Sequence, residues 1–283
     1  QLDMEMSFVD QDDVLAAIGE AVLDAAEAVT GERPDPIERI TWLDAMNSTG
    51  SDRPDLRFGM TFKDAADIFS GTSYGIFKQI LGRGGCIKGI NVKGQSERLS
   101  KNVLQNEYAK EIVPGFGAKG MTWMRVVEEG LESNIVQFFS DFERQEILSR
   151  FEAEKGDVIL MIADPSWSLV CSALGQLRLH LADRLGLIPA GLFCPLWVTD
   201  FPLFDATEQG VTSSHHPFTM PDRTDFDPEN IEELLSLKSR AYDLVMNGEE
   251  LGGGSIRIND RTLQNRIFKA LGLSDTDVEE KFG

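Results

Sequence analysis

Apolar and polar residues alternate strictly along the first eight positions of the chain. The apolar members are Leu2, Met4, Met6 and Phe8. A period of two is that of a half-buried β-strand, so this stretch predicts a strand with Asp3 on its polar face. From Asp10 onward the apolar residues fall mostly at four-residue steps, which predicts a helix with an aspartate N-cap and Gly31 as its C-terminal cap.

Two boundaries divide the remaining chain. Residues 47–55 are dense in turn formers, and a mixture of helical and strand-like runs follows from residue 58 to residue 163. Within that stretch, strands are expected at 86–92, 121–127 and 157–163, and helices at 62–69, 101–112 and 135–151. Beyond it, the pattern predicts a helix at 169–185, a strand at 195–201 and a helix at 263–271. We therefore expect an α+β chain in which a smaller α+β domain, 58–163, is inserted between a first part, 1–57, and a second part, 164–283, of a larger domain.

A β-hairpin is expected around Asn247-Gly248, the dipeptide best suited to a two-residue type I′ turn, because both central positions need a positive φ. In this hairpin Val245 lies opposite Glu250. Asp243 is two residues before Val245, so its carboxylate shares a face with that of Glu250, about 7–8 Å away. One hydrated divalent cation fits between the two carboxylates. The alternative is a pair of ordinary solvated surface charges.

The opposite face of the hairpin carries Leu244 and Leu251, which we expect to point into a core. The apolar residues after the glycine run 252–254 have the other parity, so an uninterrupted strand would place them on the polar side. A one-residue slip within the glycine run corrects the parity, since glycine accommodates bulges. The slip also brings Arg257 onto the acidic face, where its guanidinium can bind a carboxylate through two hydrogen bonds.

Composition limits the classes of function. The chain has 283 residues, 42% of them hydrophobic, which is enough for sizeable cores. No apolar run approaches membrane-spanning length, and no charged-then-apolar leader opens the chain. The three cysteines are widely separated and lack metal-ligand spacing, so we expect reduced thiols in a cytoplasmic protein. The net charge of −20 argues against a nucleic-acid partner, because affinity for phosphate comes largely from Lys and Arg.

Two adjacent histidines, His215 and His216, precede Pro217. A metal site is a poor interpretation, because adjacent side chains of an extended chain point in different directions and no third ligand is spaced for zinc. A general acid–base pair and a polar lid over a bound small molecule both remain open.

Four motifs occur in order along the chain. They are Gln-Leu-Asp-Met-Glu-Met-Ser-Phe at 1–8, Gly-Ser-Asp-Arg-Pro-Asp-Leu-Arg at 50–57, His-His-Pro-Phe-Thr at 215–219 and Gly-Gly-Gly-Ser-Ile-Arg-Ile at 252–258. In this order and spacing they resemble bacterial-type aspartyl-tRNA synthetase over essentially the whole chain. Thr49 is a departure, since the family usually has an aromatic residue before that glycine.

The resemblance implies a class II synthetase fold, an antiparallel sheet flanked by helices, that makes aspartyl-adenylate from aspartate and ATP and then charges tRNA. Asp3 resembles the family's ligand for the α-ammonium group of aspartate, and Arg257 its ligand for the side-chain carboxylate. A guanidinium prefers that carboxylate to the neutral amide of asparagine. His215 matches a histidine that contacts the amino acid, with His216 beside it, which favours the lid.

The resemblance further implies that Asp243 and Glu250 bind ATP and Mg²⁺. Residues 58–163 look like the insertion domain that these synthetases share with a subunit of a tRNA-dependent amidotransferase, with a role at the acceptor arm of tRNA. The family's three class II motifs, which supply the dimer interface and two ATP-binding arginines, are not in this sequence. We therefore expect part of a longer, homodimeric, cytoplasmic enzyme that also has an anticodon-binding domain, and no appreciable ligase activity from this part alone.

Two other functions stay open. The chain is a tRNA-binding module in one of them, since the insertion also occurs in the amidotransferase. In the other it is an amino-acid-activating relative that makes asparagine without tRNA, against which the long insertion argues.

Overall fold

The computed structural model describes residues 2–282 and shows an α+β protein. The chain forms two compact units, Gln1–Asp44 with Phe193–Gly283, and Ala45–Leu192. We call them the split unit and the central unit. The limits expected from the sequence for an inserted domain, 58–163, are narrower than the central unit and stay a prediction.

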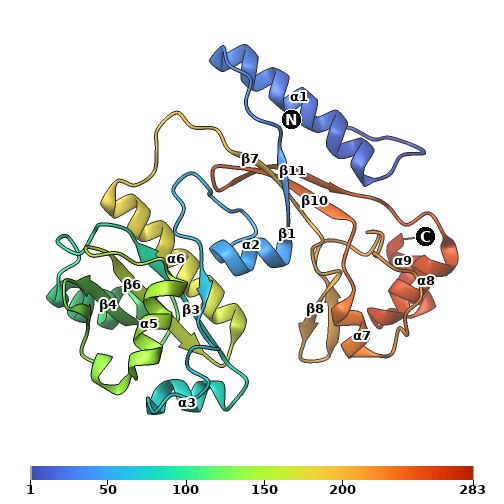
Figure 1. Cartoon of the computed structure of the whole chain (residues 1–283). Coiled ribbons are helices and arrows are strands. Elements are labelled where there is room, and N and C mark those ends of the chain that lie inside the picture. The colour runs from blue at the N-terminus through green and yellow to red at the C-terminus, as the bar shows by residue number, and fades with distance from the viewer. Residues whose placement is uncertain (1, 283) are drawn as a thin grey trace. The chain divides into compact units, whose positions relative to one another are not determined.

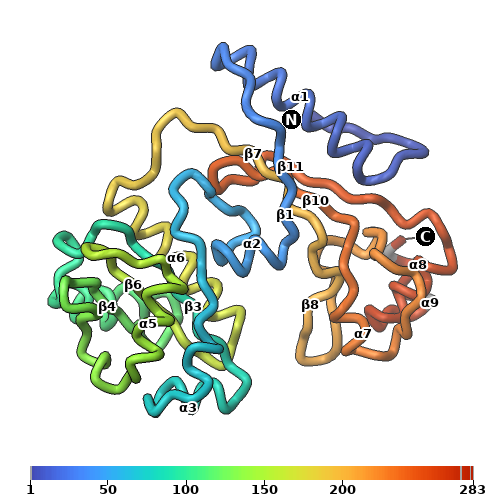
Figure 2. The backbone as a smooth tube through the Cα atoms, viewed as in Figure 1, coloured from blue at the N-terminus to red at the C-terminus, as the bar shows by residue number. Residues whose placement is uncertain are grey.

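The split unit is built on a four-stranded sheet in the order β1-β7-β10-β11 (Figure 1). The strands are β1 (Glu38–Thr41), β7 (Pro195–Thr199), β10 (Ala241–Met246) and β11 (Glu249–Ser255). β1 runs parallel to β7, and the other neighbours are antiparallel. Figure 2 shows the blue β1 segment beside the strands from the far end of the chain. The sheet therefore pairs residues that are far apart in the sequence, such as Glu38 with Leu196.

Helix α1 (Gln11–Thr30) forms as its sequence predicts. Asp10 caps its first turn through a capping box with Asp13, and Gly31 ends it in the left-handed conformation with φ of 80°. The helix packs through Leu15 against a cluster that includes Trp197 of β7. The apolar stripe of α1 thus covers one face of the sheet.

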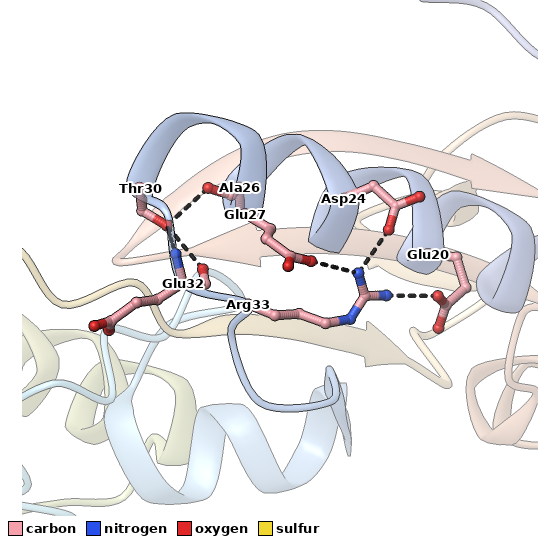
Figure 3. Close-up of polar contacts among 7 residues, drawn as sticks. All are labelled: Glu20, Asp24, Ala26, Glu27, Thr30, Glu32 and Arg33. Carbon is pink, nitrogen blue, oxygen red and sulfur yellow. Dashed lines mark hydrogen bonds and ion pairs between the residues drawn. The ribbon is translucent and has the colours of Figure 1, made fainter.

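The chain that leaves α1 folds back beneath the helix (Figure 3). The guanidinium of Arg33 bonds to Glu20 and Asp24, each at 2.6 Å, and to Glu27 at 3.1 Å. These carboxylates are at least half exposed, so the network fixes the direction of the chain more than it stabilises the fold.

The strand expected at residues 1–8 is wrong. Residues 2–6 belong to no strand and to no isolated bridge that the structure describes, and Gln1 lies outside the described residues. Leu2 is 78% exposed, and the side chain of Phe8 is fully exposed. An alternating pattern becomes a strand only where a neighbouring strand accepts its hydrogen bonds, and residues 2–6 have no such neighbour in the described chain.

The remaining elements of the split unit enclose a second small core. They are β8 (Phe204–Thr207), β9 (Gly210–Ser213), α7 (Ile231–Ser236), α8 (Arg261–Ala270) and α9 (Asp275–Phe282). Leu234 of α7 and Ile267 of α8 are each 1% exposed and belong to the same cluster. The loop with the histidine pair follows β9 directly, so this core supports it.

The central unit contains a five-stranded antiparallel sheet in the order β2-β3-β6-β4-β5. The strands are β2 (Lys63–Asp64), β3 (Cys86–Val92), β6 (Val158–Asp164), β4 (Thr122–Val127) and β5 (Gly130–Glu132). The helical elements of this unit are the larger part of α2 (Trp42–Thr49), which crosses the boundary at Ala45, α3 (Gly75–Leu81), the π-helix η1 (Val103–Ile112), α4 (Val113–Gly115), the 3₁₀ turn η2 (Val136–Phe138), α5 (Asp141–Arg150) and α6 (Trp167–Leu185). Leu160 and Leu174 meet in one core, and Met161 and Phe77 in the other, so the sheet is covered on both faces.

Most predicted elements of this unit are confirmed, and the helix expected at 62–69 is wrong. That stretch forms β2 and a series of turns. The Asp64 carboxylate accepts the backbone N–H of Ala66 at 2.9 Å, and Arg150 bonds to Asp67 at 2.7 Å. Phe69 is fully buried. Aspartates that bond to nearby backbone groups favour turns over helix, and the turns still bury the apolar side chains.

Arg178 of α6 is 1% exposed and anchors the segment after α2. Its guanidinium donates to the carbonyl oxygens of Asp55 at 2.7 Å and Gly59 at 2.6 Å, and lies 4.1 Å from the ring centre of Phe58. Burial lowers the pKa of Arg178 to about 10. Carbonyl acceptors therefore take the place of water around a buried cation.

Two general properties follow from the described residues. No helix among residues 2–282 combines the length and the apolar composition needed to cross a membrane. All three cysteines carry thiols rather than disulfide sulfurs in the described structure, as expected.

Candidate functional site

The hairpin of β10 and β11 forms with the predicted turn and register. Asn247 and Gly248 have φ values of 57° and 88°, and Val245 lies opposite Glu250. Asp243 is two residues from Val245 on the same strand, so the register places Asp243 and Glu250 on one face of the sheet. Asp243 is half-buried and Glu250 is exposed.

The bulge lies one position earlier than expected. Leu244 is opposite Gly252, so Leu251 is the extra residue on β11. Leu244 is 3% exposed, whereas Leu251 is 49% exposed, and the expectation that Leu251 points into the core is wrong. A bulged residue drops out of the alternation of the strand, which leaves the neighbouring glycine to face the core-directed Leu244.

The glycine run gives space to the side chains of the opposite strand. A Cβ atom at Gly253 would collide with the carboxylate oxygen of Asp243 and lie 3.3 Å from its Cγ. A Cβ atom at Gly254 would lie 2.7 Å from the hydroxyl of Tyr242 and 2.9 Å from its ring. The Asp243 carboxylate therefore packs against the backbone of Gly253 on one face of the sheet. The Tyr242 ring packs against the backbone of Gly254 on the other face.

The donor set on the acidic face fits a magnesium ion that carries water and phosphate. No three His, Cys, Asp or Glu side chains gather at metal-binding distance in the described part of the chain. Mg²⁺ is held in many nucleotide sites by one or two carboxylates, with water and phosphate oxygens as the other ligands. Asp243 and Glu250 supply that number of carboxylates from one hairpin.

Arg257 contacts His216. The Arg257 guanidinium lies against both ring nitrogens of His216, with Nη1 3.1 Å from Nδ1 and a shorter contact to Nε2. The Oγ of Ser255 is 3.2 Å from Nε2, and the backbone N–H of Phe218 donates to Nδ1 at 3.2 Å. The histidine loop and the strand extension that carries the arginine are thereby joined through their side chains.

Backbone pairing places the two segments side by side. Thr219 and Arg257 form an antiparallel bridge, and the N–H of Ile258 donates to the carbonyl of Phe218 at 2.9 Å. Burial, then the charge of Arg257 and that of the neighbouring histidine, lower the pKa of His216. A neutral imidazole keeps a lone pair that can accept an arginine N–H, so the lowered pKa agrees with the contact.

The other histidine lies differently. His215 is exposed, and its ring meets that of Phe201 edge-on at 4.9 Å. The Nε2 of Gln264 on α8 donates to the carbonyl of Pro217 at 2.8 Å and anchors the loop. The sequence predicted that His215 contacts the amino acid, with His216 beside it. The structure brings the ring of His216 against the guanidinium of Arg257.

Asp3 lies in the segment before α1, which has no regular secondary structure, and is exposed. Its place beside the hairpin stays a prediction. Sequence reasoning missed Ser255, Gly253 and Gln264. Only Gly253 carried a signal, because a glycine run on one strand of a hairpin opposite Tyr242-Asp243 predicts side chains that lie across the glycines.

Comparison with known proteins agrees with these observations. The family model of the class II tRNA synthetases (D, K and N) matches residues 1–283. Aspartate--tRNA(Asp/Asn) ligase 1 of Syntrophus aciditrophicus is 66% identical over 286 residues, which cover 100% of this chain and 39% of that protein. Aspartate--tRNA(Asp/Asn) ligase of Persephonella marina is 43% identical over 293 residues and that of Symbiobacterium thermophilum 42% identical over 292, with 48% and 49% of those proteins covered. The chain thus spans less than half the length of these relatives.

Proposed function

Because the chain belongs to the class II tRNA synthetases of the D, K and N group, we propose that it is part of an aspartate–tRNA ligase. The whole enzyme activates aspartate with ATP and transfers it to tRNA. The observation that carries the proposal is the hairpin, where the Asp243 carboxylate lies on the backbone of Gly253, on the face shared with Glu250 and close to the segment that carries Arg257.

Asp243 and Glu250 would hold Mg²⁺, which neutralises charge on the phosphates of ATP when it is bound. The contribution of the chain is to orient the two carboxylates. Gly253 does this for Asp243, since any side chain at position 253 would push the carboxylate away from the strand. The register of the hairpin places Glu250 on the same face as Asp243.

Arg257 would bind the side-chain carboxylate of aspartate, and Asp3 its α-ammonium group. His216 positions the guanidinium from one side without adding a competing positive charge, because its lowered pKa keeps the ring neutral at pH 7. His215, on the exposed side of the same loop, would cover the bound amino acid. Asparagine carries a neutral amide in place of that carboxylate. Binding of asparagine would leave the Arg257 guanidinium without a charged partner, which disfavours it.

No protein nucleophile is required. The carboxylate of aspartate attacks the α-phosphate of ATP directly, so the protein accelerates the reaction by positioning both reactants and neutralising charge. The names of the relatives favour tRNAs of both aspartate and asparagine as acceptors for the whole enzyme. A homodimeric state and a cytoplasmic location are supported by likeness to the family alone. A tRNA-binding module would give the hairpin and the Arg257–His216 contact no role.

Calorimetric titration of this chain with aspartate and with asparagine tests the proposal. Arg257→Gln is expected to weaken aspartate binding at least tenfold and to remove the preference over asparagine, since hydrogen bonds to charged groups contribute about 1.5–3 kcal/mol. Arg261→Gln makes the same change of charge at an exposed position of α8 and serves as the control. Equal binding of the two amino acids by the unaltered chain contradicts the proposal.

A separate titration with Mg-ATP tests the acidic pair. Asp243→Asn is expected to weaken Mg-ATP binding while leaving the aspartate preference in place. A uniform loss of both ligands in Asp243→Asn, with an unchanged unfolding curve, would contradict the separate roles of the two groups.

A further inference from the structure

The central unit contains a cavity of about 360 Å³ that the proposed function does not use. It lies between helix α3, the start of β4 and the end of β6, and its apolar walls include Ile76, Ile80, Met121 and Met161. Sites for small ligands typically occupy about 300–1,000 Å³ and are mostly apolar with a few polar groups. The cavity has the volume of such a site, and polar side chains make up a larger share of its walls.

Two cations at the cavity have no partner in the described structure. Of the lysines and arginines of the central unit, all but Lys78, Arg83 and Lys119 form an ion pair or a side-chain hydrogen bond within the described residues. Arg83 and Lys119 both line the cavity and are exposed. In a unit where the other cations are engaged, this pair is available to an anion.

An aromatic ring with a fixed orientation forms part of the wall. Tyr74 lines the cavity and is stacked on Phe138, with ring centres 5.7 Å apart and an angle of 25°. Phe77 and Phe139 meet the same ring edge-on at 5.0 and 5.9 Å. Three aromatic neighbours hold Tyr74 in place, so a planar ligand would meet a preformed surface.

Charge separates this unit from the rest of the chain. Residues 45–192 contain 17 Lys and Arg against 18 Asp and Glu, whereas the remaining residues contain 10 against 29. The net charge of −20 therefore belongs almost entirely to the split unit. A polyanion is repelled there and meets an almost neutral surface on the central unit, with Arg83 and Lys119 as uncommitted cations.

We propose that the cavity binds one unstacked nucleotide of a single-stranded nucleic acid. The base lies against Tyr74 and the aliphatic walls, and the phosphate is held by Arg83 and Lys119. Asp164 also lines the cavity, and its carboxylate can accept a hydrogen bond from an exocyclic amino group of the base. The carboxyl terminus of an apolar peptide would use the walls and one cation but would bring no amino group to the Asp164 carboxylate, one oxygen of which already accepts the backbone N–H of Ser166 at 2.9 Å. The inference requires none of the residues of the hairpin site.

The test is binding of a fluorescein-labelled single-stranded RNA octamer to the chain, followed by anisotropy over a series of salt concentrations. For Arg83→Gln and for Lys119→Gln, the slope of log K against log salt is expected to fall by about 0.7 for each phosphate that the variant no longer neutralises, which is about a fivefold weaker affinity at 0.1 M salt. Lys78→Gln is the matched control, because Lys78 lies on α3, lacks a partner in the described structure and does not line the cavity. Its affinity is expected to change less than twofold.

A second variant tests the apolar wall. Ile76 is 57% exposed, so Ile76→Ala leaves the fold intact, and it is expected to weaken binding without a change in the salt slope. A decrease in affinity for Lys78→Gln as large as that for Arg83→Gln, or a duplex of the same sequence that binds as tightly as the single strand, overturns the proposal. Displacement of the RNA by an apolar peptide with a free carboxyl terminus, unmatched by a nucleoside monophosphate, also overturns it in favour of a peptide site.

Discussion

Gly253 and Gly254 are adjacent on β11 but face opposite sides of the sheet, so the same substitution should affect stability at one position and ligand binding at the other. Neither glycine has a positive φ, and alanine therefore introduces no backbone strain at either position. The Cβ at position 253 meets the carboxylate of Asp243, and the Cβ at position 254 meets the ring of Tyr242. The first neighbour lies on the face proposed to bind a ligand, and the second belongs to the core.

The magnitudes follow from what each neighbour can do. Tyr242 is 9% exposed, and its ring meets Trp197 edge-on at 6.0 Å, so a Cβ only 2.7 Å from its hydroxyl forces the core to repack. Overpacking of this kind costs about 1–3 kcal/mol, or about 4–8 °C in Tm for 2 kcal/mol in a chain of this size. The Asp243 carboxylate can rotate at a cost of about 0.5–1.5 kcal/mol, which the lower entropy of unfolded alanine offsets by about 0.4–1 kcal/mol.

We therefore expect Gly254→Ala to unfold at lower temperature with Mg-ATP binding reduced only through stability. Gly253→Ala should keep its Tm within about 2 °C and weaken Mg-ATP binding, because its carboxylate is displaced. Thermal unfolding by circular dichroism and calorimetric titration of both variants measure the two quantities. Equal decreases of Tm in the two variants, or unchanged Mg-ATP binding in Gly253→Ala, would refute the assignment of the two faces.

Three further predictions concern the interior and the histidine loop. Gly50→Ala should lower the free energy of unfolding in urea by more than about 3 kcal/mol, because its Cβ would lie 2.9 Å from the carbonyl carbon of Cys171. Gly59→Ala has a similar positive φ but lies in open space, and it should lower the free energy of unfolding by only about 1–2 kcal/mol. The free energy of unfolding should fall as pH drops below about 6.5, since folded His216 has a lowered pKa and binds fewer protons there than the unfolded chain does; His216→Gln should flatten this part of the pH profile. Burial raises the pKa of Cys171 to about 11, so its thiol should resist a thiol reagent until the chain unfolds, while the partly exposed Cys194 reacts in the folded protein.

Each of these three predictions would be contradicted by a specific result. Similar costs at Gly50 and Gly59 would mean that left-handed backbone, rather than the close approach of α2 and α6, decides the effect. A pH profile that His216→Gln leaves unaltered between pH values of about 5 and 7 would assign the titration to another group. Modification of Cys171 at the rate of Cys194 would show that the central core opens without global unfolding.

Local chemistry made part of the fold predictable. The Asn247-Gly248 turn fixed the register of the hairpin, and Asp10 and Gly31 fixed the ends of α1, because each signal acts within a few residues of itself. The strand expected around Asp3 depended on a neighbouring strand that no local pattern can supply. The stretch 62–69 depended on a choice between helix and turns, which Asp64 settled by a backbone hydrogen bond.

In the candidate site, one part could likewise be predicted from local sequence, and the other depends on long-range pairing. The acidic pair, Asp243 and Glu250, comes from one hairpin, so its shared face could be derived from the turn alone. The contact between Arg257 and His216 joins residues 41 positions apart through the bridge at Thr219, and parity along β11 gives no information about that partner. The half of the site that would bind Mg²⁺ and phosphate is thus encoded locally, whereas the half that would select the amino acid depends on tertiary pairing. Mutations that disturb the Thr219 bridge should therefore change the preference for aspartate before they change the binding of Mg-ATP.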